Sequence, residues 1–251
     1  MNALVLTLLL AASDPHADCL DTPAEALCRE RKQAYDDDDI PGMRALIERE
    51  VAAVHASFDG PVTIGALQPL CLPLEAGFNV CNEGRSEDDC AQTYLDQYAA
   101  NGCLEDPAQR PRYDNMHAMY WHRRMDHGRA LEHLQRAEST AWALWLTQWD
   151  EAVRTRALVS IVVSMSLRAQ IAASLRNVDE LRANLLAIEL LRARLAAPGL
   201  TGLVADTLNG LAWSLLMARE AELTTEDPTP LLLTALGDHM HTRPNRRKAD
   251  N

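Results

Sequence analysis

The sequence predicts an all-α protein in which stacked helical hairpins follow a disulfide-stapled, partly irregular helical region. Leu, Ala and Arg, which favour helices, dominate the second half of the 251 residues, and aromatic residues make up only 5%. Helix-capping signals open several segments whose apolar residues recur with helical spacing. All six cysteines precede residue 104, which indicates a separate stapled region at the start of the chain.

The first element is an expected signal peptide over residues 1–13. Residues 3–12 form an uninterrupted apolar run of the length of a signal-peptide core, which is too short to span a bilayer. Small residues at 11–13 predict cleavage before Asp14. The segment lacks Lys and Arg, so an ordinary N-terminal helix or a misplaced start codon are the alternatives. We expect a periplasmic or secreted protein with no integral membrane span in the mature chain.

The cysteines of the next region, residues 14–112, predict disulfides. Their even number and the lack of C-x-x-C spacing favour disulfides over a zinc site or buried free thiols. The sequence leaves their connectivity open. One pairing is disfavoured, because a single helix over 86–100 would hold Cys90 and Cys103 about 20 Å apart. The expected disulfide cysteines are Cys19, Cys28, Cys71, Cys81, Cys90 and Cys103.

Within this region, capping residues and prolines mark the helices. A capping box with proline predicts a first helix to about Tyr35, and Pro41 opens a second helix through about Ser57. Residues 60–85 are rich in Gly and Pro and are expected to be irregular. A third helix over 86–100 is expected to end at Asn101-Gly102, before a linker over 106–111. The buried face of the second helix is predicted to comprise Met43, Leu46, Ile47, Glu50 and Val54.

Residues 113–240 show a recurring pattern of helical hairpins. The first hairpin turns at 125–128, and Asn177 to Glu180 again resembles a capping box. From residue 241 the composition is polar and mildly basic, typical of a flexible tail, here 241–251. The expected helices cover 114–124, 130–149, 151–175, 177–197 and 201–222, with a last short helix after Pro230.

Two stretches of this half resemble a known repeat family. The residues M-D-H-G-R-A-L-E-H-L-Q-R-A-E (125–138) resemble the turn and second helix of a tetratricopeptide repeat (TPR). The residues L-N-G-L-A-W-S-L-L-M-A-R-E (208–220) resemble a first helix. Met125 and His127 replace the usual Gly-Tyr pair. The resemblance implies a TPR-like solenoid over 113–240 with a concave surface that binds proteins or peptides, and it implies no catalytic residues.

The distribution of charge restricts the partners. The net charge is −12, and residues 1–112 hold 20 acidic and 8 basic side chains, whereas the rest hold 16 of each. An acidic protein repels nucleic-acid phosphates and anionic lipids, so a protein or peptide with a basic surface is the expected partner. The acidic run Asp36, Asp37, Asp38 and Asp39 could contact it. The alternative is a solvated acidic loop, because the run lacks the spacing of a calcium loop.

Other candidate side chains receive less support. Trp142, Trp145 and Trp149 are expected on one helical face, where they could line a peptide-binding groove or belong to the core. Four histidines at 117, 122, 127 and 133 are five, five and six residues apart, which does not place them on one face of a helix. We therefore predict no metal site. Nucleotide-binding and hydrolase motifs are missing, so we predict neither a cofactor nor catalytic residues.

These observations favour an exported helical-repeat protein that binds a protein or peptide in the cell envelope. A narrower hypothesis is an immunity protein or inhibitor that neutralises a toxic effector. The alternatives are an envelope hydrolase with its site in the cysteine-rich half, around Glu87, Asp88 and Asp89, and a structural assembly subunit. The sequence determines neither the identity of the partner nor the oligomeric state.

Overall fold

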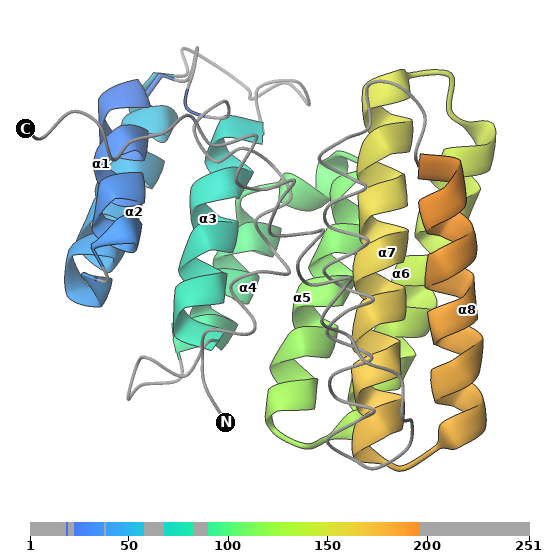
Figure 1. Cartoon of the computed structure of the whole chain (residues 1–251). Helices are drawn as coiled ribbons and strands as arrows, with labels where there is room; N and C mark the ends of the chain where they lie inside the picture. Colours follow the sequence, from blue (N-terminus) through green and yellow to red (C-terminus); the bar gives the residue numbers. More distant parts are fainter. Residues whose placement is uncertain (1–18, 20–22, 38, 58–67, 83–89, 196–251) are drawn as a thin grey trace, which may run out of the picture. The chain divides into compact units, whose positions relative to one another are not determined.

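The all-α class is confirmed by a computed structural model, which describes residues 19, 23–37, 39–57, 68–82 and 90–195 (Figure 1). Within these residues there are eight α-helices and no strand. The expected signal peptide, the helices expected after residue 200 and the tail lie outside the described residues. The helices are α1 (Glu25–Asp36), α2 (Ile40–Ala56), α3 (Gln68–Val80), α4 (Cys90–Ala100), α5 (Gln109–Arg123), α6 (His127–Thr147), α7 (Glu151–Ser174) and α8 (Val178–Leu195), with a short 3₁₀ turn, η5, at Cys103–Glu105.

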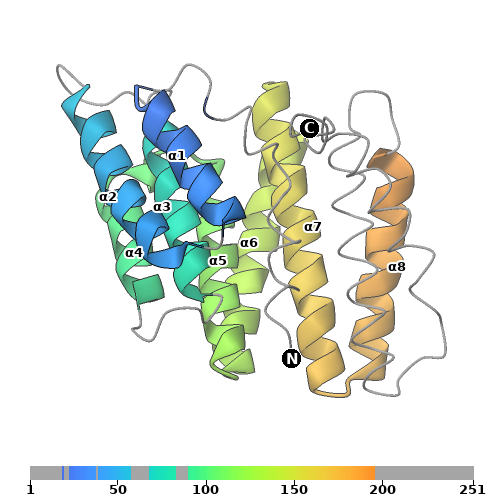
Figure 2. The ribbon, with the colours of Figure 1, turned by 60° about the vertical axis from the view of Figure 1, so that its left-hand side comes forward.

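The described residues divide into two compact units, one ending at Ala157 and one beginning at Leu158. The helix α7 contributes residues to both. Arg112, where the expected cysteine-rich region ends, lies inside α5. In the first unit the helices pack chiefly on their neighbours in the chain, from α1 on α2 through to α5 on α6 (Figures 1 and 2).

The first two helices form an antiparallel pair close to the predicted bounds. The predicted buried face of α2 is confirmed, apart from Leu46, which is only partly buried. Arg31 of α1 and Glu50 of α2 form an ion pair inside this interface. Burial of one apolar stripe, rather than helix propensity, is what holds such short helices in place.

The expectation of an irregular segment over 60–85 is wrong for residues 68–80, which form α3 despite Pro73 within it. Proline removes one backbone hydrogen bond from a helix interior. Leu70, Leu74 and Phe78, four residues apart, are fully buried on one face. Burying three large apolar side chains contributes about 2 kcal/mol each, which outweighs the proline penalty of about 3 kcal/mol. The rest of the segment, except for Cys81 and Asn82, lies outside the described residues.

Close packing of α3 on α4 depends on a glycine. A Cβ atom at Gly77 would overlap the ring of Tyr94, so the two helices approach where no side chain separates them. The predicted end of α4 is confirmed: Gly102 follows it with φ of 79°, a left-handed conformation that glycine adopts without strain. The chain then turns through η5 into α5.

The predicted hairpin is confirmed as the antiparallel pair α5 and α6. Met125 in the turn has φ of 60°, and the backbone N–H of Asp126 donates to the carbonyl of Trp121 over 3.0 Å. The Asp126 carboxylate then accepts from the backbone N–H of Arg129 over 3.1 Å, which caps α6. The turn and the cap together fix which residues of the two helices face each other.

The expected disulfides are confirmed, and the structure supplies their connectivity. Two bonds are local and join residues nine apart: Cys19 to Cys28, and Cys81 to Cys90. The third bond, between Cys71 and Cys103, spans 32 residues and ties α3 to η5, with 5.8 Å between the two Cα atoms. Cys90 and Cys103 are not paired, as predicted. All six cysteines are buried.

The second unit contains the later part of α7, followed by α8. The turn between them places Arg176 at φ of 55°, and Asn177 caps α8 by accepting from the backbone N–H of Glu180 over 3.2 Å. Ala169, Ala172, Ala173 and Leu181 form a small buried cluster. By length and composition alone α7 could cross a membrane, but most of it is buried, as is typical of the core helix of a soluble protein.

Candidate functional site

The end of α6 exposes large apolar side chains to solvent. Leu146, in the last turn, is 71% exposed, and Trp149 is 98% exposed. The helix ends at Thr147, and Gln148 has extended backbone with ψ of 139°. Trp149 therefore lies in the link to α7, and the expectation that it shares a helical face with Trp142 and Trp145 is wrong.

Trp142 and Trp145, the other two candidate tryptophans, are half-buried near the end of α6. The rings of Trp142 and Trp145 meet edge to face, with centroids 5.5 Å apart. The guanidinium of Arg154, at the start of α7, lies 5.9 Å from the centroid of the Trp145 ring. We call Trp142, Trp145, Leu146 and Trp149 the tryptophan patch. A half-buried aromatic pair that is followed in the sequence by two exposed apolar side chains could accommodate apolar side chains of a partner.

Carboxylates of the acidic run form hydrogen bonds with the helices on either side of it. Asp36 is the last residue of α1, and the side chain of Asp37 accepts a hydrogen bond from Gln33 over 2.9 Å. The carboxylate of Asp39 caps α2 by accepting from the backbone N–H of Gly42 over 3.0 Å. Asp38 lies outside the described residues. The carboxylate of Asp39 therefore has a structural role that the sequence reasoning did not assign to it.

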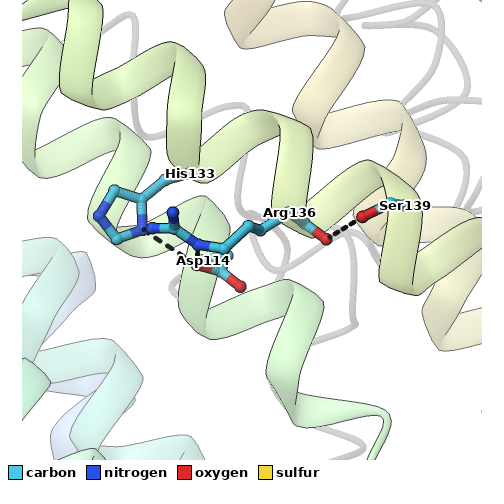
Figure 3. A network of polar contacts seen from close by, with 4 residues as sticks. All are labelled: Asp114, His133, Arg136 and Ser139. Carbon is cyan, nitrogen blue, oxygen red and sulfur yellow. Dashed lines mark hydrogen bonds and ion pairs between the residues drawn. The ribbon is translucent and has the colours of Figure 1, made fainter.

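A polar cluster joins α5 to α6 (Figure 3). Asp114 of α5 lies opposite His133 and Arg136 of α6. Its Oδ1 atom is 2.9 Å from Nδ1 of His133 and accepts a hydrogen bond from Nε of Arg136 over 3.2 Å. A terminal nitrogen of Arg136 is also 2.7 Å from Nδ1 of His133. The hydroxyl of Ser139 donates to the carbonyl of Arg136 over 3.1 Å, one turn further along α6.

A series of rings continues from this cluster towards α4. The imidazoles of His117 and His133 stack with centroids 4.6 Å apart and planes inclined by 10°. Tyr113 meets His117 edge to face at 4.6 Å and stacks on Tyr98 at 5.9 Å. Burial, together with the neighbouring imidazole of His133, lowers the pKa of His117 to about 4. His117 is therefore neutral at pH 7.

A second imidazole pair lies beside the hairpin turn. The Nδ1 atoms of His122 and His127 are 3.4 Å apart. Burial, followed by the proximity of His127 and Arg123, lowers the pKa of His122 to about 4. The carboxylate of Asp126, four residues after His122, caps α6 instead.

A third polar group is buried between α3, α4 and α5. Glu75 forms an ion pair with Arg112 at 2.6 Å, and the hydroxyl of Tyr98 donates to the side-chain oxygen of Gln109 over 2.8 Å. Burial, and secondarily the charge of Glu75, raises the pKa of Tyr98 above its ordinary value. These contacts pair buried polar atoms with one another, which is what a stable helix interface requires. The sequence reasoning missed Glu75 because it expected that segment to be irregular.

The contact of His117 with His133 across the hairpin was also missed, although the sequence contained a signal for it. In an antiparallel hairpin, residues at equal distance from the turn lie at the same level. His117 and His133 are eight residues before and after Met125, and Asp114 and Arg136 are eleven before and after it. The sequence reasoning compared spacings within one helix only, so it excluded a one-helix site without examining pairs across the hairpin.

The proposed carboxylate site at Glu87, Asp88 and Asp89 lies outside the described residues. Among the residues that the structure does describe, no three His, Cys, Asp or Glu side chains come together to hold a metal ion. Comparisons of the chain with protein-family models, with curated proteins and with solved structures find no match.

Proposed function

We propose that this protein is an exported helical scaffold that binds a protein or peptide partner in the cell envelope through the tryptophan patch. The observation that carries the proposal is the exposure of Trp149 and Leu146, at 98% and 71%. Tryptophan dominates the binding energy of many protein interfaces, and large apolar side chains exposed together are typical of interaction sites.

The disulfides support the exported location. Three bonds among six cysteines, with no free thiol among the cysteines described, suit an oxidising compartment such as the periplasm or the extracellular space. The packing of α5 on α6 supports a solenoid of hairpins over residues 113–240, of which a TPR-like arrangement is the specific form that we propose.

Charge supports a partner with a basic surface. The excess of acidic side chains in residues 1–112 would attract such a partner and repel nucleic acids. An immunity protein or inhibitor that neutralises a basic toxic effector is the narrower form of the proposal. A gene for such an effector beside the gene for this protein would support that form.

Photo-cross-linking in the cells that produce the protein tests the patch directly. We expect a photoreactive phenylalanine at position 149 to give a discrete, light-dependent adduct with a partner, because Trp149 would lie at the centre of the interface. The same residue at position 135, an exposed position on α6, is the control and should give none. The adduct is then identified by mass spectrometry.

Substitution of Trp149 measures how much this side chain contributes to the binding free energy. Trp149→Ala should weaken binding of the identified partner by about thirty-fold, the effect of losing an interface hot spot of about 2 kcal/mol. The fold should not change, because Trp149 is almost fully exposed. Equal adducts at 149 and 135, or unchanged affinity of the Trp149→Ala variant, would exclude the patch as the binding site.

A further inference from the structure

Two pairs of imidazoles bridge the interface between α5 and α6 at different levels. His122 and His127 face each other beside the turn, with 3.4 Å between their Nδ1 atoms. His117 and His133 face each other further from the turn, stacked at 4.6 Å. Each pair takes one histidine from each helix. A charge placed on both members of a pair would therefore push the two helices apart.

The charged and titratable groups around the two histidine pairs differ, so positive charges on the two pairs would be balanced to different extents. Around His117 they are Tyr113 and Asp114 on α5, His133 and Arg136 on α6, and Asp96 on α4. Around His122 they are His127 and Arg123, both of which disfavour a positive charge there. The carboxylate nearest in the chain, Asp126, caps α6. The other pair has Asp114, but this carboxylate is already bound by Arg136.

His133 links protonation to a change of hydrogen bonds. Its Nδ1 atom lies within hydrogen-bond distance of Arg136, a donor, and of Asp114, an acceptor. An unprotonated Nδ1 can accept from Arg136, whereas a protonated Nδ1 can donate to Asp114, and one nitrogen cannot do both. In the neutral tautomer that carries its proton on Nε2, protonation of Nδ1 therefore exchanges the contact with Arg136 for a hydrogen bond to Asp114.

We propose that the α5–α6 hairpin is an acid-responsive element, in which protonation of the two imidazole pairs between its helices loosens their contact. The inference does not depend on the proposed partner. Its direction follows from burial: His117 and His122 stay neutral while the helices are packed and regain the ordinary histidine pKa of about 6.5 when the helices separate. The open form then binds more protons, so packing is fully favoured above about pH 6.5 and is lost as the pH falls towards 4.

Hydrogen exchange of the mature protein, corrected for the intrinsic effect of pH, measures the opening. We expect protection of amides in residues 113–140 to fall by about ten-fold or more between pH 7 and pH 5. In the double variant His117→Phe/His122→Phe, which keeps flat rings but cannot be protonated there, the fall should be less than about three-fold. The His55→Gln variant is the control, because His55 is exposed on α2, and it should behave as the wild type.

A titration of the histidine side chains of the wild-type protein by NMR tests the same inference without a substitution. Two hairpin histidines should titrate near pH 4, and assignment through the variants should identify them as His117 and His122. Titration of all four hairpin histidines near pH 6.5 would overturn the proposal. The same pH dependence of protection in the wild type and in a folded double variant would also overturn it.

Discussion

Replacing Cys71 and Cys103 together by alanine is expected to lower the free energy of unfolding by about 4 kcal/mol. The bond closes a loop of 32 residues, and the conformational freedom that it removes from the unfolded chain grows with loop length. The loss is large compared with the total stability of a typical domain, about 5 to 15 kcal/mol. Urea denaturation followed by circular dichroism measures it.

The bond between Cys81 and Cys90 supplies a matched control, because it closes a loop of only nine residues and joins the residue after α3 to the first residue of α4. The corresponding double alanine variant removes the same atoms but should cost about 3 kcal/mol. Alanine is preferred to serine in both variants because all four cysteines are buried, and a hydroxyl there would need a partner. A smaller loss for Cys71 and Cys103 than for Cys81 and Cys90 would contradict this explanation.

Arg31→Met is expected to destabilise the protein by about 3 to 5 kcal/mol. Arg31 contacts Glu50 through two nitrogens, at 2.6 and 3.3 Å, and also donates to the sulfur of Cys28 over 3.5 Å. The side chain of Glu50 is only 3% exposed, so removing its partner leaves a buried carboxylate without compensation. The same urea denaturation measures the loss at pH 7.

Two further variants separate the charge from the packing. The double variant Arg31→Met/Glu50→Leu removes both charges and keeps the volume, so its stability should return to within about 1 kcal/mol of the wild type. Arg49→Met breaks the ion pair with Glu30, which joins the same two helices at 4.0 Å on the surface, and should cost less than about 1 kcal/mol. A double variant as unstable as Arg31→Met alone would show that packing, rather than the unpaired charge, causes the loss.

The sequence predicted those elements whose signals are local. Pro41 and the spacing of Met43, Ile47 and Val54 were enough to place α2, because capping and helical periodicity act within one or two turns. The helix α3 was missed for the opposite reason. Its prolines and glycine argue against a helix locally, whereas its stability comes from the contact of Leu74 and Phe78 with the core and of Gly77 with Tyr94, which are set by packing.

The candidate sites show the same division. The tryptophans were identified by type, but the end of α6 at Thr147, which leaves Trp149 in the solvent, was not predicted. The disulfide state followed from the number of cysteines, whereas their pairing required the positions of α3, α4 and η5. The cluster of Asp114, His133 and Arg136 depends on the register of a hairpin, which a search within single helices could not reveal.

The measurement that tests the central claim most directly is disulfide mapping of the protein recovered from an oxidising compartment. Digestion after glutamate and aspartate without reduction separates all six cysteines, and mass spectrometry identifies the linked peptides. We predict a chain that begins at Asp14 and carries the bonds Cys19–Cys28, Cys71–Cys103 and Cys81–Cys90. An uncleaved chain with six alkylatable thiols would contradict both the export and the stapled scaffold.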